Sequence, residues 1–272
     1  MHKSETSKIQ PLITVLLVAV ESGFGPQLTR RQDSAISSLS VPGRSRDKAS
    51  SRFGLRRRNL AILKSATYDM KPFREDTVIL LVANPVDVLT YFCQKYSGLP
   101  KGQIIGSGTF LDSARLRGIL AAKLGVDAGS VDAYVLGEHG ESQMVAWSCV
   151  TVGAVPLDQC LLPGASIDRK AVALETKDKA AKIIEAKGAT AYGIGALSAA
   201  ICKSILFDQR NVRPISHWVA EYGCCLSLPV VLGRRGIIRS LSIPLNQEER
   251  GLLHKSADTL KKFIQEAEQA QK

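Results

Sequence analysis

The sequence lacks the cysteine patterns of a metal site or of a disulfide framework. Its six cysteines include no Cys-x-x-Cys pair, and none of them clusters with one of the four histidines. Zinc-binding chains and small secreted chains show such spacing. We therefore expect free thiols, a cytoplasmic compartment and no bound metal.

Hydrophobic runs long enough for a membrane are also missing. The apolar stretch at residues 11–20 has only ten residues, far fewer than a membrane span needs. Its length would suit the core of a signal peptide, but Glu21 and Phe24 spoil the cleavage site that should follow. We favour the other interpretation, a buried parallel strand over residues 13–20, and expect no membrane partner.

The positive charge has no aromatic residues interleaved with it. Net charge is +11, and residues 1–76 hold 14 Lys and Arg against 7 Asp and Glu. Nucleic-acid-binding surfaces combine basic patches with aromatic residues or a known motif, and neither accompanies Arg56–Arg58 or the other basic residues here. We expect no nucleic-acid partner, and a solvated face or an anion-binding enzyme site instead.

A dinucleotide-binding turn is only partly present after the first strand. Gly23 and Gly25 supply two glycines of the Gly-x-Gly-x-x-Gly pattern, but Leu28 stands at the third position. Pro26 also removes a backbone N–H that would bind the pyrophosphate. From Gly25 to Gly43 there are only 18 positions, too few for the two further β-α units of a complete dinucleotide-binding fold, which include the acidic residue that binds ribose.

A histidine between two glycines is the most prominent motif. Gly137-Glu138-His139-Gly140 follows residues 132–136, which are expected to form a strand, so His139 should lie where the chain leaves a sheet. The glycines permit a tight backbone path and close approach of a ligand. By itself, such a histidine is more often structural than catalytic.

Two charged residues upstream share one face of a predicted helix, which ends near Gly125. Asp112 and Arg115 are three residues apart, so they could form a surface ion pair worth a few tenths of a kcal/mol. Alternatively, Asp112 accepts a hydrogen bond from His139 while Arg115 binds a carboxylate through two parallel bonds. Spacing alone leaves both interpretations open.

Three motifs, taken together, resemble a known family. They are Val-Ala-Asn-Pro-Val-Asp at 82–87, Leu-Asp-Ser-Ala-Arg at 111–115 and Gly-Glu-His-Gly at 137–140. In this order they look like the signature of the NAD-dependent L-lactate and malate dehydrogenases, most of all the L-lactate dehydrogenases. The resemblance runs from about residue 52 to the C-terminus. It implies NAD as cofactor, a short 2-hydroxy or 2-oxo acid as substrate and a homo-oligomer, with roughly 50 residues of the first nucleotide-binding half missing.

The resemblance also implies roles for single residues. His139 would donate a proton to the substrate carbonyl, Asp112 would steady the imidazolium, and Arg52 would polarise the carbonyl from a mobile loop. Implied substrate contacts are Arg115, Asn84, Thr190 and Arg46, and implied cofactor contacts are Gly43, Ser65, Val82, Asn84 and Ser107.

Several of these residues have simpler interpretations. Arg46 and Arg52 could serve loop solubility, Thr190 could bond locally at a helix start, and Asn84 could cap a helix. Lactate-type members usually carry a glutamine where Arg46 falls, so this arginine favours malate as an alternative substrate. The sequence is also compatible with a catalytically impaired subunit or with an unstable, truncated chain.

We predict an α/β fold: an incomplete doubly wound (Rossmann-like) parallel sheet in residues 1–104, of which 1–50 are divergent, and a mixed α+β catalytic domain in residues 105–272. The predicted strands cover residues 13–20, 35–41, 77–83, 132–136, 143–155, 224–232 and 236–244. The predicted helices cover residues 59–68, 85–97, 111–124, 168–186, 189–206 and 247–268.

Overall fold

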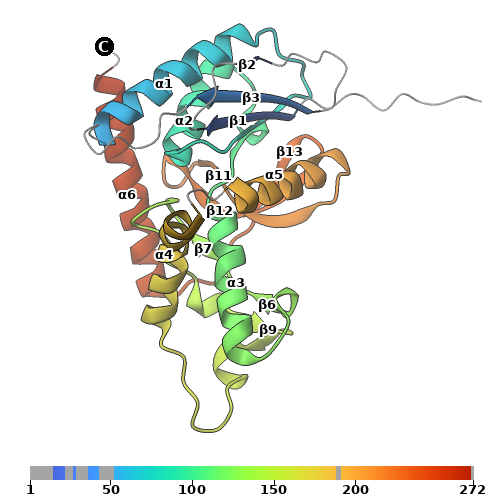
Figure 1. The fold of residues 1–272 in the computed structure, drawn as a ribbon, viewed down its shortest axis with the longest axis vertical. Helices are drawn as coiled ribbons and strands as arrows, with labels where there is room; N and C mark the ends of the chain where they lie inside the picture. The colour runs from blue at the N-terminus through green and yellow to red at the C-terminus, as the bar shows by residue number, and fades with distance from the viewer. Residues whose placement is uncertain (1–14, 22–26, 29–35, 43–51, 188–190, 271–272) are drawn as a thin grey trace, which may run out of the picture.

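One mixed β-sheet runs through the molecule (Figure 1). The computed structural model describes residues 15–21, 27–28, 36–42, 52–187 and 191–270, and in these residues eight strands lie in the order β13-β12-β11-β5-β4-β1-β3-β2. Their bounds are β1 Val15–Glu21, β2 Gln27–Leu28, β3 Ile36–Pro42, β4 Val78–Leu81, β5 Ile104–Gly106, β11 Asn211–Val219, β12 Cys224–Gly233 and β13 Gly236–Ser240.

The middle of the sheet is parallel. β1 pairs with β3 on one side and with β4 on the other, and β4 pairs with β5. The predicted strands near residues 13–20, 35–41 and 77–83 are thus confirmed. Because these strands are parallel, their carboxyl ends meet at one edge, where α/β folds bind ligands.

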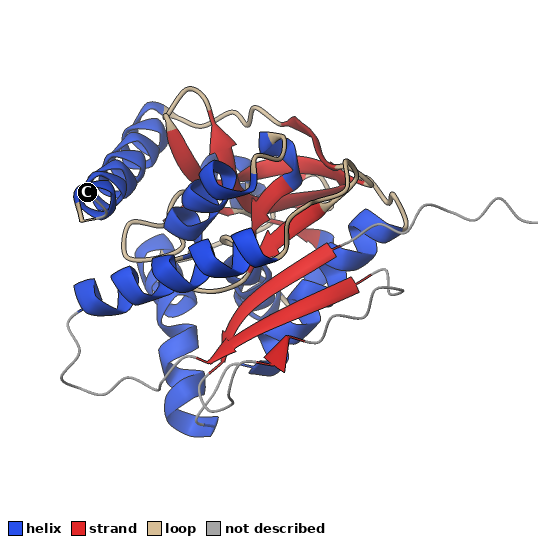
Figure 2. Cartoon of the chain, turned by 90° about the horizontal axis from the view of Figure 1, so that it is seen from above, coloured by secondary structure: helices blue, strands red, loops and turns tan. Residues whose placement is uncertain are grey.

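Helices cover both faces of the sheet (Figure 2). Their bounds are α1 Arg52–Asp69, α2 Val86–Ser97, α3 Phe110–Leu124, α4 Arg169–Lys187, α5 Ala191–Leu206 and α6 Gln247–Gln269. Alternation along β4 separates the two faces: Ile79 and Leu81 join the cluster built with α1, α2 and α6, whereas Val78 and Leu80 join the cluster built with α5. All four side chains are buried, as the continuous apolar run predicts. The α/β class is confirmed.

The carboxy-terminal strands extend this same sheet. β11 pairs antiparallel with β5, β12 with β11, and β13 with β12. The predicted hairpin of β12 and β13 is confirmed, although β13 ends at Ser240, four residues early. β11 was not predicted, because Pro214 interrupts its sequence pattern and a proline cannot donate to a ladder.

The predicted strands at residues 132–136 and 143–155 are wrong in extent. The chain instead forms a two-stranded and a three-stranded sheet of dipeptide strands. Val131 and Asp132 pair with residues 151–152, whereas Val135 and Leu136 pair with residues 144–145, so the chain passes from one small sheet to another. The short elements are β6 Val131–Asp132, β7 Val135–Leu136, β8 Met144–Val145, β9 Thr151–Val152 and β10 Val155–Pro156, with 3₁₀ helices η1 Lys101–Gln103, η2 Ala128–Ser130, η3 Trp147–Cys149 and η4 Leu157–Gln159.

The predicted C-terminal ends of α2 and α3 are confirmed, but the predicted N-cap of α2 is not. α2 and α3 end at Gly98 and Gly125, with φ of +75° and +68°, values that favour glycine. The prediction that Asn84 caps α2 is wrong, because the cap position is Pro85 and no side chain bonds there. Instead, the backbone carbonyl of Asn84 accepts a hydrogen bond from Asn59 Nδ2 at 2.8 Å.

Among the described residues, every helix is too short or too polar to cross a bilayer.

Candidate active site

The candidate site lies where α2 and α3 begin, just after the carboxyl ends of β4 and β5. Val82 and Asn84 follow β4, and Ser107 follows β5, its N–H donating to the Leu81 carbonyl at 2.8 Å. Val82 and Ser107 are half-buried and Asn84 is exposed. A ligand at this edge of the sheet could therefore reach all three predicted residues.

His139 and Asp112 form the central contact. His139 Nδ1 lies 2.7 Å from Asp112 Oδ2, so the predicted pairing is present. Because a carboxylate only accepts hydrogen bonds, Nδ1 carries a proton and Nε2 is the nitrogen that can exchange one. The side chain of Asp112 is 4% exposed and that of His139 is 28% exposed. The imidazole thus has one buried, oriented side and one accessible side.

Arg115 contacts the other oxygen of the same carboxylate. Its Nη1 donates to Asp112 Oδ1 at 3.2 Å, and its side chain is 11% exposed. The ion pair suggested by the i, i+3 spacing therefore exists, but it is buried rather than on the surface. A guanidinium has five N–H donors, so this bond leaves Arg115 others with which to bind a carboxylate.

The first turn of α3 fixes the strand that leads to His139. Ser113 Oγ accepts from Val135 N at 2.9 Å, and the hydroxyl of Thr109 donates to the Val135 carbonyl. Both polar groups of the Val135 backbone are therefore held by side chains on either side of Asp112. This arrangement sets the distance from Asp112 to His139.

The loop that carries His139 is held from two other elements. The backbone N–H of His139 donates to Asp87 Oδ2 on α2 at 2.8 Å, and the backbone N–H of Glu138 donates to Ser256 Oγ on α6 at 2.8 Å. Gly137 lies at φ +86°, where a Cβ would come within 2.6 Å of Ser256 Oγ. The glycine before His139 is therefore required both by backbone conformation and by close packing.

Electrostatics favour the charged form of His139. Burial opposes the charge, but the hydrogen bond with Asp112 and the charges of Asp112 and Asp87 outweigh burial and the repulsion from Arg115, so the pKa of His139 is raised. A raised pKa keeps a proton available on the imidazole near neutral pH. This state suits a general acid.

The other predicted residues are less completely placed. Arg52 begins α1, and exposed Ser65 on the same helix donates from Oγ to Asp69 Oδ2 at 3.3 Å. Gly43, Arg46 and Thr190 lie outside the described residues, as do Gly23, Gly25 and Pro26 of the glycine-rich turn.

Sequence reasoning missed Asp87 and Ser256. Asp87 belongs to the 82–87 motif, and an acid in the first turn of an apolar helix was the available signal. Ser256 is fully buried on α6, in a sequence that gave no indication of a contact with the His139 loop.

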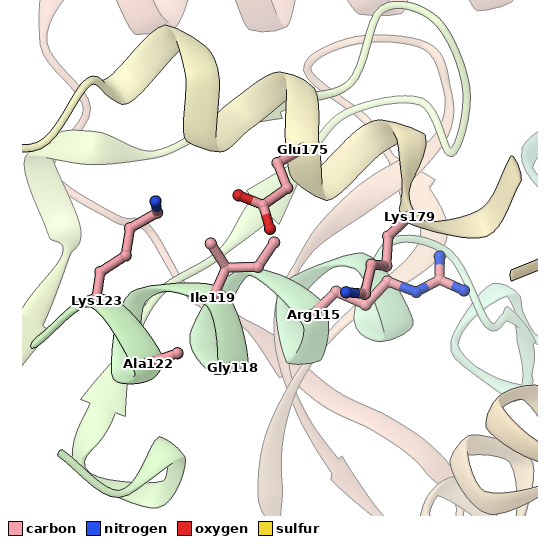
Figure 3. A pocket seen from close by; sticks show the side chains of 7 residues that line it. All are labelled: Arg115, Gly118, Ile119, Ala122, Lys123, Glu175 and Lys179. Carbon is pink, nitrogen blue, oxygen red and sulfur yellow. The ribbon is translucent and has the colours of Figure 1, made fainter. Parts of the chain in front are cut away.

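A cavity of about 440 Å³ opens beside this site, between α3 and α4 (Figure 3). α3 contributes Arg115 and Lys123 and α4 contributes Glu175 and Lys179, around the apolar side chain of Ile119. The lining is basic on balance, which suits an anion.

The fold and the site define an α/β protein with an acid–base pair at the carboxyl edge of a parallel sheet. Residues 31–106 match the NAD binding domain of the lactate/malate dehydrogenases, and residues 109–271 match their alpha/beta C-terminal domain. The chain belongs to the lactate/malate dehydrogenase family. The two matches meet between residues 106 and 109, and the domain boundary at residue 104 stays a prediction.

Similar proteins carry lactate dehydrogenase names. L-lactate dehydrogenase A of Rhizopus oryzae is 46% identical over 75% of this chain and 63% of its own length. An L-lactate dehydrogenase of Streptococcus agalactiae is 44% identical over 77% of this chain and 66% of its own length. The chain thus spans a little under two thirds of the length of these relatives.

Solved structures agree with the fold. A lactate dehydrogenase enzyme from a Medee basin deep-sea metagenome library has a TM-score of 0.83 at 27% identity, covering 94% of this chain and 99% of that one. The minor L-lactate dehydrogenase of Enterococcus mundtii has a TM-score of 0.78 at 26% identity, covering 93% and 98%.

Proposed function

We propose that this chain transfers a hydride reversibly between NAD(H) and a short 2-oxo or 2-hydroxy acid, with pyruvate and L-lactate as its substrates. The observation that carries the proposal is the Asp112 carboxylate, which bonds His139 with one oxygen and Arg115 with the other. This joins a proton donor and a carboxylate-binding group at the edge where α/β folds bind ligands. The names of the relatives support the substrate.

Each residue then has one task. His139 Nε2 donates a proton to the substrate carbonyl oxygen in reduction and removes it in oxidation, while Asp112 holds the imidazole in the required tautomer. Arg115 binds the substrate carboxylate with the N–H groups not used by Asp112. Asn84 and Thr190 contact substrate, and Arg52 stabilises the charge that develops on oxygen.

The cofactor fits this chain in part. Nicotinamide supplies or accepts the hydride when it is bound, and Val82, Asn84 and Ser107 lie at the correct edge of the sheet to hold it, with Gly43 and Ser65 as further proposed contacts. On the adenosine side the fit is poor, because neither β2 nor β3 contains an acidic residue to bind the ribose. We therefore propose that NAD(H) is held mainly by its nicotinamide half.

Malate and oxaloacetate are a second candidate pair. Arg46 supports them, because a positive charge near the substrate could pair with a second carboxylate. We also propose a homo-oligomer, by analogy with the family, and a cytoplasmic location, because the six cysteines are all unpaired.

Absorbance of NADH during reduction of pyruvate or oxaloacetate tests the proposal. We expect the purified chain to oxidise NADH faster with pyruvate, and His139→Asn to lower turnover by about 10² to 10⁴ with little change in NADH affinity. Asp158→Asn, at an exposed aspartate on η4 outside the site and the cavity, is the control and should leave turnover unchanged. Equal turnover in wild type and His139→Asn would reject the assignment of His139, and faster turnover of oxaloacetate would favour the second candidate.

A further inference from the structure

Asp87 is a buried carboxyl group to which the proposed reaction gives no role. Its relative exposure is 2%, and a buried acid normally has its oxygens fully hydrogen-bonded. In the part of the chain that the structure describes, Oδ2 accepts a hydrogen bond from the backbone N–H of His139 at 2.8 Å. Among the described residues, neither Oδ1 nor the buried hydroxyl of Ser216 on β11 has a partner at ordinary hydrogen-bonding distance. The Ser216 hydroxyl nevertheless interacts with Asp87 closely enough to lower the pKa of that carboxyl group.

A full set of hydrogen bonds would explain a buried acid as a purely structural group. Here the one direct partner among the described residues is His139, the proposed proton donor. Asp112 approaches the imidazole of His139 from α3, and Asp87 approaches its backbone from α2. The histidine is thus held between two carboxyl groups from two different helices.

We propose that Asp87 is a positioning residue for His139: it anchors the histidine through the backbone and places a second negative charge beside the imidazole. This inference rests on the proposed function, since it assigns Asp87 to the proton donor of that reaction. The added charge favours the protonated imidazole, the form that binds and reduces a 2-oxo acid.

The charges around the pair agree with this role. Burial raises the pKa of Asp87 to about 6, against the opposing effects of the Ser216 hydroxyl and of His139. Asp87 is therefore ionised above about pH 6, and the pKa of His139 is raised partly by its charge. The other groups that interact electrostatically with either residue are Asp112 and Arg115 from α3, Glu138 from the loop, and Cys224 and Cys225 from β12.

NMR of histidine-labelled protein, titrated from pH 5 to 10 without cofactor or substrate, tests the inference. The His139 signals are identified by their loss in His139→Asn. In the wild type we expect a main inflection from the imidazole and a smaller one near pH 6 from Asp87. In Asp87→Asn, whose amide oxygen can still accept from the His139 N–H, the small inflection should vanish and the main midpoint should fall to lower pH.

A structural role alone would not move the midpoint. Asp132→Asn, at an exposed aspartate on β6, should leave both inflections unchanged. The folded-state pKa of Asp87 lies above its unfolded value, so its ionisation costs stability above about pH 6. The thermal midpoint of Asp87→Asn at pH 8 should therefore equal or exceed that of the wild type.

Ser216→Ala provides an independent test. Loss of the hydroxyl that lowers the pKa of Asp87 should move the small inflection to higher pH. A His139 midpoint that is the same in wild type and Asp87→Asn would overturn the inference, as would a small inflection that Ser216→Ala leaves in place. The titration needs no turnover. If the inflections of the variants shift as expected but the wild type reduces no 2-oxo acid, only the proposed function is rejected.

Discussion

Replacing Asp112 by Asn tests the buried carboxylate on which the candidate site depends. The wild-type carboxylate bonds His139 at 2.7 Å and Arg115 at 3.2 Å. An amide has one oxygen and one NH₂ group. Its oxygen can accept a hydrogen bond from His139 or from Arg115, but its NH₂ group, which is a donor, then faces the N–H of the other partner. Arg115, with a side chain only 11% exposed, then loses its counter-charge.

The size of the effect follows from these contacts. A hydrogen bond to a charged group contributes about 1.5–3 kcal/mol, and removing one partner of a buried pair costs about 3–5 kcal/mol. Because Asn keeps one acceptor, we expect the free energy of unfolding at pH 6 to fall by about 2–4 kcal/mol. For a chain of this length the thermal midpoint should drop by roughly 4–7 °C.

The effect should also depend on pH. The pKa of His139 is raised in the folded state, so its interaction with Asp112 stabilises the fold fully below the unfolded pKa of about 6.5. This contribution is lost as pH rises through the folded pKa. The difference between wild type and Asp112→Asn should therefore be larger at pH 6 than at pH 9.

Thermal unfolding followed by circular dichroism measures both differences. Asp158→Asn is a matched control, because Asp158 also pairs with an arginine but its side chain is 73% exposed. We expect it to cost no more than about 0.5 kcal/mol. The reasoning would be refuted if Asp112→Asn lowered the free energy of unfolding by as little as the control does, or by the same amount at pH 6 and pH 9.

Other predictions concern ligand binding and packing. Arg115→Lys should raise KM for pyruvate more than it lowers kcat, because an ammonium cannot make two parallel bonds to a carboxylate; initial-rate kinetics would show an unchanged KM if Arg115 were structural. NADH should bind roughly 10²- to 10⁴-fold more weakly than expected for a complete dinucleotide fold, since Leu28 replaces the third glycine of the turn and neither β2 nor β3 supplies an acidic residue for the ribose. Micromolar binding in a fluorescence titration would contradict this. Gly108→Ala should prevent stable folding, because its φ is +52° and a Cβ would collide with Ser227 Oγ and lie 2.5 Å from the backbone nitrogen of Ser216. Gly118→Ala, where nothing lies within 4 Å of an added Cβ, should stabilise α3 by about 0.5–1 kcal/mol in urea unfolding. Equal stabilities of the two variants would contradict the packing.

The sequence predicted those parts of the fold that local patterns determine. The apolar run at 78–81 became a buried strand, and Leu253, Ala257, Leu260 and Ile264 became the buried face of α6. In the site, Asp112 and His139 could be paired because both belong to recognisable motifs. Such features depend on periodicity or on a few neighbouring residues.

Other features depend on partners far away in the chain. β11 becomes a strand despite Pro214 because β5 and β12 flank it. Residues 132–136 divide between two short strands because β6 pairs with β9 and β7 pairs with β8, in separate sheets. The bonds of Asp87 and Ser256 to the His139 loop likewise join residues 52 and 118 positions apart, and no local pattern specifies such contacts.

The bond from Glu138 to Ser256 has a consequence for how the chain matures during synthesis. The partners are separated by 118 residues, so a ribosome adding about 5–20 residues per second needs roughly 6–24 s to supply Ser256 after Glu138. Asp112 and Arg115 can meet within one helical turn during that delay, but the loop that presents His139 must wait for α6 to emerge and dock. The nascent chain therefore carries Arg115, the proposed substrate-binding residue, well before it carries a correctly held His139, and the pair of Asp112 and His139 is completed only after α6 has emerged and docked.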